Sequence, residues 1–120
     1  MTAADYSPRG VEDAIRDTAE RISRGVAVRA KAYRDFLEAD HAHDLAEARA
    51  YVAAKDYPAH ERKFRAVLAT EDERRARDVA DAVYRHAEAQ WRALDAELRA
   101  WQSVGASVRA MYGVAGVGER

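Results

Sequence analysis

The sequence predicts an all-α protein, a long antiparallel helical hairpin with coiled-coil-like packing. Ten of the seventeen arginines follow an acidic residue by four positions, an orientation that stabilises a helix by about 0.2–0.5 kcal/mol per pair. Apolar residues recur in steps of three and four along most of the chain. One proline interrupts this pattern near the middle of the chain, as expected for two long helices joined by a short turn.

The first helix is expected to begin at Pro8, after a flexible segment of residues 1–7. Ser7 is a favourable N-cap, and Pro8 suits the first helical position because its missing N–H leaves no hydrogen bond unmade there. An apolar stripe predicts that this helix continues as far as the turn. Its members are Val11, Ile15, Thr18, Ile22, Val26, Ala30, Tyr33, Leu37, His41, Leu45, Ala48 and Val52.

Pro58 predicts a turn near residues 55–59. Proline disfavours helical geometry at the residue before it, and Asp56 is a candidate cap for the next helix. A second break is open at Thr70, because Thr70 and Glu73 have the spacing of a capping box. The pattern leaves two alternatives: a short helix that ends near Ala69, or one long helix that is continuous or kinked at Thr70.

A second stripe predicts the last helix: Ala76, Ala80, Val83, Ala87, Trp91, Leu94, Leu98, Trp101, Gly105, Val108 and Tyr112. Two successive steps of four, around Ala87 and Trp91, predict a stutter in the supercoil. The acid–arginine pairs at 81–85, 88–92 and 95–99 recur every seven residues, so we expect a charged ladder on a solvent-exposed face. Gly113 should end the helix as a left-handed cap, so that the helical domain spans 8–112 and residues 113–120 form a flexible tail.

Large apolar side chains are sparse relative to alanine, so the predicted interior is thin. We therefore expect a second copy or another protein to complete the burial, which makes the protein an oligomer or a partner-binding module. Trp and Tyr are frequent interface anchors. The candidate partner-binding residues are Trp91, Leu98, Trp101, Val108 and Tyr112, with ordinary core packing as the alternative interpretation.

The formal net charge of −1 gives no overall attraction to nucleic acid or to an anionic membrane. Several basic residues nevertheless lack an acidic residue one helical turn before them. The candidate phosphate contacts are Arg29, Lys31, Arg34, Arg62 and Arg74, with a solvated helix face as the alternative. The N-terminus lacks the form of a signal peptide, and no apolar run is long enough to span a bilayer, so we expect a cytoplasmic protein.

No catalytic, cofactor-binding or metal-ligating residue is predicted. The chain has no cysteine, which removes thiolate chemistry and Cys-based zinc sites. Glu38 and His41 have the Glu-x-x-His spacing of di-iron bundles, but such sites need a second motif that this sequence lacks. His41 and His43 lie about 200° apart on a helix and cannot readily share a metal. Both are therefore interpreted as ordinary surface or boundary histidines.

The segment from Tyr51 to Tyr112 resembles a group of small helical proteins encoded by actinobacterial phages and prophages. The matching segments are residues 50–54 (Ala-Tyr-Val-Ala-Ala), residues 69–74 (Ala-Thr-Glu-Asp-Glu-Arg) and, most specifically, residues 101–110, from Trp101 to Ala110. The threonine-led turn of that group is replaced here by Asp56-Tyr57-Pro58.

The resemblance carries over no activity, and it implies an accessory role among replication and recombination functions, in the host cytoplasm. We accordingly expect a non-enzymatic protein-binding hairpin that modulates a replication, recombination or host component. A nucleic-acid-binding accessory protein and a structural or assembly component of a virion are the alternatives.

Overall fold

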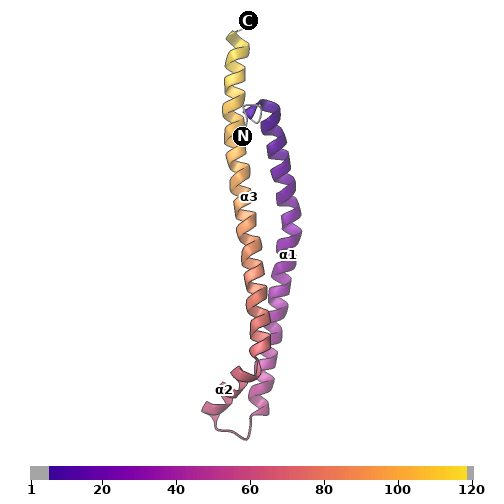
Figure 1. Cartoon of the computed structure of the whole chain (residues 1–120), viewed down its shortest axis with the longest axis vertical. Helices are drawn as coiled ribbons and strands as arrows, with labels where there is room; N and C mark the ends of the chain where they lie inside the picture. Colours follow the sequence, from indigo (N-terminus) through magenta and orange to yellow (C-terminus); the bar gives the residue numbers. More distant parts are fainter. Residues whose placement is uncertain (1–5, 119–120) are drawn as a thin grey trace. The chain divides into compact units, whose positions relative to one another are not determined.

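The computed structural model describes residues 6–118 of the chain and the side chains of residues 6–113. This part of the chain is all helical, with α1 (Pro8–Ala53), α2 (Ala59–Ala69) and α3 (Glu71–Gly118) following one another without a strand (Figure 1). The predicted all-α class is confirmed. Most of the predicted flexible N-terminus, and the last two residues of the predicted tail, lie outside the described residues. None of the three described helices contains a stretch that could cross a lipid bilayer.

The start of α1 is the one that the sequence predicts. The backbone N–H of Gly10 donates to the Ser7 hydroxyl at 3.1 Å, and the backbone N–H of Val11 donates to the Ser7 carbonyl at 2.9 Å. Ser7 therefore caps the helix, and Pro8 occupies its first position, where no N–H is required.

The predicted turn near residues 55–59 is confirmed, but the predicted cap at Asp56 is wrong. Pro58 occupies the N-cap position of α2, and no side chain hydrogen-bonds to this helix end. The Pro58 carbonyl accepts the backbone N–H groups of Glu61 and Arg62 at 2.9 and 3.0 Å. Because proline itself precedes the first helical residue, Asp56 lies too far back along the chain to act as the N-cap.

At Thr70 the chain contains a helix break, the first of the two alternatives. Thr70 is only 1 % exposed, and its hydroxyl donates to the Ala66 carbonyl at 2.8 Å. Its backbone N–H points to the Val67 carbonyl at 3.4 Å. A capping box would use the Thr70 hydroxyl as an acceptor for α3. Here the hydroxyl acts as a donor to the last turn of α2, which ends at Ala69.

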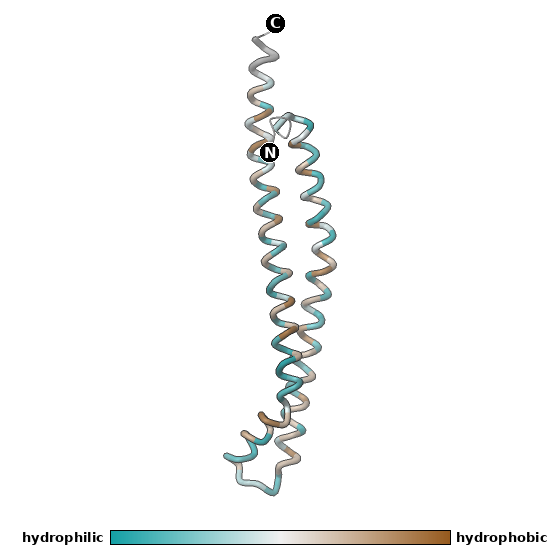
Figure 2. The backbone as a smooth tube through the Cα atoms, in the orientation of Figure 1, coloured by the Kyte–Doolittle hydropathy of each residue, from teal (hydrophilic) through white to brown (hydrophobic). Residues whose placement is uncertain are grey.

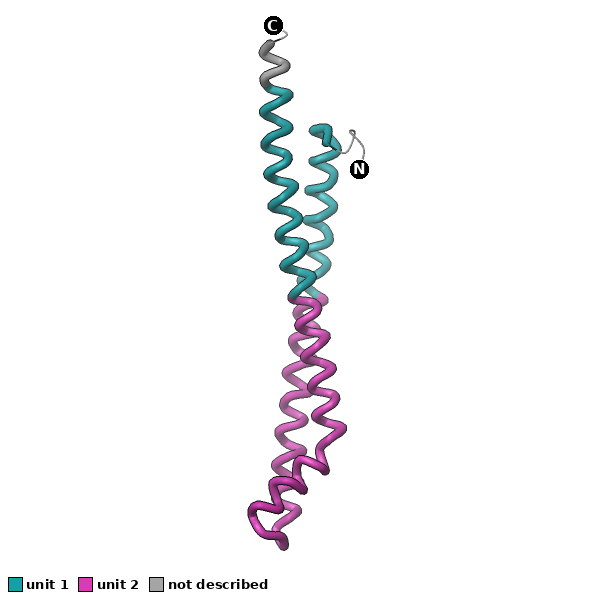
Figure 3. Tube along the Cα trace, turned by 60° about the vertical axis from the view of Figure 1, so that its left-hand side comes forward, with its two compact units in different colours: residues 1–27, 89–120 teal, residues 28–88 magenta. Residues whose placement is uncertain are grey.

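The chain divides into two compact units, and both α1 and α3 pass through each of them (Figure 3). Unit 1 contains residues 1–27 and 89–120. In its described part, a Cβ placed on Gly105 would lie 3.2 Å from Val11, and Arg21 contacts the Glu97 carboxylate at 3.0 Å. A later residue of α1 thus contacts an earlier residue of α3, so the two helix segments of unit 1 are antiparallel.

Unit 2 contains residues 28–88, with the second part of α1, all of α2 and the first part of α3. Arg29 contacts the Glu88 carboxylate at 3.0 Å, and the guanidinium of Arg77 lies 3.3 Å from the His43 ring. The helix segments of α1 and α3 are therefore antiparallel in unit 2 as well.

The predicted apolar stripe of α1 is correct as far as Ile22 and wrong beyond it. Most of the buried or half-buried residues lie at seven-residue intervals in two series: Val11, Thr18, Gly25, Ala32, Ala39 and Ala46, and Ile15, Ile22, Arg29, Phe36, His43 and Ala50. The larger apolar residues of the predicted stripe are exposed: Val26, Tyr33, Leu37, Leu45 and Val52. Positions that meet a neighbouring helix along its length repeat about every 3.5 residues. The prediction followed the large side chains instead, which are spaced slightly further apart and drift off this face.

The buried face of α3 also follows an unbroken seven-residue repeat. Its two series are Arg77, Tyr84, Trp91, Leu98 and Gly105, and Ala80, Ala87, Leu94, Trp101 and Val108. Ala76 and Val83 are exposed, so the predicted stutter at Ala87 and Trp91 is wrong. Hydrophilic and hydrophobic residues are interspersed along both long helices (Figure 2).

The predicted helix end at Gly113 is wrong. α3 continues to Gly118, and none of the glycines in the described part of the chain has a positive φ. A glycine inside a helix costs about 1 kcal/mol relative to alanine, which is too little to stop a long helix by itself.

Candidate functional site

In the described part of the chain, at least five of the predicted acid–arginine pairs form salt bridges within a helix. They are Asp17–Arg21 at 3.3 Å, Glu61–Arg65 at 3.6 Å, Glu71–Arg75 at 2.8 Å, Asp81–Arg85 at 3.1 Å and Asp95–Arg99 at 3.0 Å. Most of these side chains are well exposed, so each pair contributes at most about 1 kcal/mol. The pairs make the helix surfaces locally neutral.

Glu88 departs from the predicted solvent-exposed ladder. Its carboxylate accepts hydrogen bonds from Arg29 at 3.0 Å and from the Tyr84 hydroxyl at 2.8 Å, and its side chain is 23 % exposed. The Tyr33 and Phe36 rings lie 5.1 and 6.4 Å from the Tyr84 ring. The hydrogen bond to Glu88 raises the pKa of Tyr84, burial and the charge of Glu88 raise it further, and Arg29 lowers it. This cluster links α1 to α3 inside unit 2.

His43 is not the surface or boundary residue that the sequence predicts, because it is only 5 % exposed. Its Nδ1 lies 3.3 Å from Arg77, and its Nε2 lies 3.3 Å from the Glu47 carboxylate. Arg77 also lies 3.9 Å from Asp40. His43 thus packs into a polar cross-helix contact, while His41 is exposed.

No three His, Cys, Asp or Glu side chains among the described residues are grouped so that they could hold a metal ion.

Four of the five candidate phosphate contacts are engaged within the chain. Arg29 contacts Glu88, and Lys31 contacts Asp35 at 2.7 Å. Arg62 donates to the carbonyls of Tyr57 and Lys55, and Arg74 donates to the Val67 carbonyl at 3.2 Å. Arg34 is exposed. Arg62 therefore binds the turn before α2, and Arg74 binds the last turn of α2. Their positions beside the two helix breaks could have suggested these contacts.

Four of the five candidate partner-binding residues pack within unit 1. Val108 is buried, and Trp91, Leu98 and Trp101 are half-buried. The Tyr6 and Trp101 rings lie 6.4 Å apart. Tyr112 is 55 % exposed. The stripe thus serves the contact between α1 and α3, and Tyr112 alone of the five is largely open to solvent.

The large apolar side chains that are exposed gather in unit 2. In the described part of the chain there are fifteen of them, and eleven lie between residues 28 and 88. On α2, Phe64 and Leu68 are 66 % and 76 % exposed. Neither residue is among the predicted site residues. The sequence pattern that could have identified them is an apolar pair four residues apart, which follows a charged segment.

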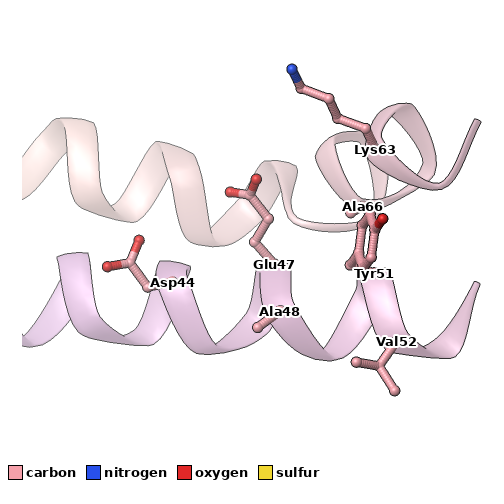
Figure 4. A pocket seen from close by; sticks show the side chains of 7 residues that line it. All are labelled: Asp44, Glu47, Ala48, Tyr51, Val52, Lys63 and Ala66. Atoms are coloured by element: carbon pink, nitrogen blue, oxygen red, sulfur yellow. The ribbon is translucent and has the colours of Figure 1, made fainter. Parts of the chain in front are cut away.

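Two shallow grooves lie where α2 meets the end of α1. One, of about 470 Å³, is lined by Asp44, Glu47, Ala48, Tyr51 and Val52 from α1 and by Lys63 and Ala66 from α2. Figure 4 shows Asp44 and Glu47 rising from the same side of α1, with the Lys63 nitrogen on α2 lying apart from both carboxylates. The other, of about 490 Å³, is lined by Ala50, Ala53, Ala54, Tyr57, Arg65, Leu68 and Ala69. This second groove is mostly apolar, and Leu68 forms part of its wall.

No protein-family model, curated protein or solved structure matches this chain.

Proposed function

We propose that this chain is a non-enzymatic helical hairpin, with coiled-coil-like packing, that works by binding protein and associates with itself. The seven-residue repeats of buried positions in α1 and α3, and their antiparallel pairing inside each unit, support the hairpin. The biological role that we propose is that of a phage accessory protein, acting on a replication or recombination component or on a host factor. The sequence resemblance supports that role.

The observation that carries the binding proposal is the apolar surface of unit 2. Single exposed apolar residues are ordinary, but contiguous apolar surface on a soluble protein marks an interaction site. α2 exposes its two largest apolar side chains, Phe64 and Leu68, and Val52 near the end of α1 is 70 % exposed. The interior polar groups are used for structure, as in the Arg29–Glu88 and His43–Arg77 contacts.

Two measurements test this proposal. Sedimentation velocity over a wide concentration range should show self-association of the purified chain. Capture of host proteins on the immobilised chain, with photo-crosslinking from position 64 or 68, should identify a partner that contacts α2. A chain that stays monomeric and crosslinks to no protein would refute the proposal.

The contacts of the candidate phosphate-binding residues argue against the nucleic-acid alternative. Arg29, Lys31, Arg62 and Arg74 each contact a carboxylate or a carbonyl of the same chain, and binding phosphate would require giving up those contacts. We expect no DNA mobility shift at about 0.15 M salt. A shift that disappears on combining Arg29→Ala with Arg34→Ala would restore that alternative.

A further inference from the structure

The exposed face of α2 has two features that suit contact with another helix. Phe64 and Leu68 are four residues apart and therefore lie on one face, one turn from each other. Ala66, on the opposite side of the helix, is 1 % exposed and lines a groove together with residues of α1. α2 thus uses its small residue for the contact within the chain and turns its large apolar residues outward.

Beside this face lies a groove that is wide enough for a large side chain. The groove of about 490 Å³ is lined by four alanines, Ala50, Ala53, Ala54 and Ala69, with Tyr57, Arg65 and Leu68 along its edges. Small residues leave room for a side chain from another helix to approach the backbone closely. The same end of unit 2 therefore carries both the projecting apolar side chains and a recess that would accept them.

Two arginines beside this face make contacts within the same chain. Arg65 lies 3.6 Å from Glu61, and its guanidinium stacks 3.5 Å above the centre of the Tyr57 ring. Arg62 donates to two backbone carbonyls of the turn. The two guanidinium groups beside this face are thus held by contacts within the chain.

We propose that this face, formed by Tyr57, Phe64, Leu68 and the alanine groove, is where a second copy of this chain docks. This inference rests on the self-association in the proposed function and names its site. In this dimer the two α2 helices are antiparallel, and the two-fold axis passes between them at the level of residue 66, midway between Phe64 and Leu68. Phe64 of one copy then lies against Leu68 of the other, and each Leu68 reaches the partner's groove.

The available area fits a reversible dimer. Tyr57, Phe64 and Leu68 are 40 %, 66 % and 76 % exposed. With the surrounding alanines they offer on the order of 500 Å² per copy, or about 1,000 Å² in the pair, which is near the lower limit of specific interfaces. The dimer should therefore form and dissociate with concentration.

Sedimentation velocity of the full chain tests the site. Leu68→Asp should raise the dissociation constant of the dimer at least tenfold, and because Leu68 is largely exposed the helical content should not change. Val28→Asp is the matched control, since Val28 is 60 % exposed in the same unit and lies about 33 Å along α1 from Ala50. This control should dimerise like the wild type.

Disulfide trapping tests the antiparallel arrangement, because the natural chain has no cysteine. A mixture of the Phe64→Cys and Leu68→Cys variants should form a covalent dimer faster than either variant alone or than Val28→Cys. A dimer that survives Leu68→Asp unchanged, or crosslinks no faster in the mixture, overturns this inference and leaves self-association standing. A wild-type chain that is monomeric at every concentration overturns both, and only binding to a different protein would remain.

Discussion

Substituting Gly105 with alanine probes how closely α1 and α3 approach in unit 1. A Cβ on Gly105 would lie 3.2 Å from Val11 Cγ1 and 3.8 Å from Ile15 Cδ1. Alanine in place of glycine stabilises a helix interior by about 0.5–1 kcal/mol. The 3.2 Å contact is closer than the 3.5–4.0 Å optimum for carbon atoms, and overpacking costs about 1–3 kcal/mol. The two effects oppose each other, so we expect Gly105→Ala to lower the free energy of unfolding by about 0–2 kcal/mol.

Gly25 provides the matched control in the same unit. A Cβ at Gly25 would meet nothing within 4 Å. Gly25→Ala should therefore raise the free energy of unfolding by about 0.5–1 kcal/mol, the full gain from helix propensity. Urea unfolding followed by far-UV circular dichroism measures both variants.

A double-mutant cycle with Val11→Ala isolates the contact. Val11 is 2 % exposed, so its truncation alone should cost about 1–2 kcal/mol. It also removes the methyl group that the new Cβ would touch, so Gly105→Ala should be more favourable in this background by about 0.5–1 kcal/mol. Equal stabilisation by the two alanine substitutions, together with additivity in the cycle, would refute the close approach of Gly105 to Val11.

Two further substitutions test unit 2. Glu88→Gln should lower the pKa of Tyr84 toward its ordinary value of 10.0, as followed by ultraviolet titration of the tyrosines, because a neutral acceptor no longer disfavours the tyrosinate. Since the folded state holds the Tyr84 proton more tightly than the unfolded state, the contribution of Tyr84 to stability should be fully present below pH 10.0 and be lost as the pH rises through the pKa of folded Tyr84. An unchanged Tyr84 titration would argue against the Glu88 contact. Thr70→Val keeps the shape of a buried side chain but loses the bond to the Ala66 carbonyl, so we expect a loss of about 1–2 kcal/mol in urea unfolding. If stability is unchanged, that hydrogen bond does not hold the end of α2.

The ends of the helices could be predicted from the sequence more readily than the exposed residues of the candidate site. The helix start at Ser7 and the turn at Pro58 were predictable, because a capping hydroxyl and a fixed φ act within a few residues. Thr70 was ambiguous, since the same hydroxyl can accept from the following helix or donate to the preceding one. Phe64 and Leu68 were visible as an apolar pair, but their exposure depends on α2 turning Ala66 toward α1.

Composition and local spacing were sufficient for the all-helical class and for five of the acid–arginine pairs, because helix propensity and pairs four residues apart are properties of a single segment. Which face of each long helix is buried was decided by the tertiary structure. Packing against an antiparallel neighbour imposes a seven-residue repeat, and it placed Arg29 and His43 inward while Tyr33 and Leu37 remained exposed. A half-buried arginine or a buried histidine needs polar partners, and here the other helix supplies Glu88 for Arg29 and Arg77 for His43. No pattern within one helix reveals these cross-helix contacts.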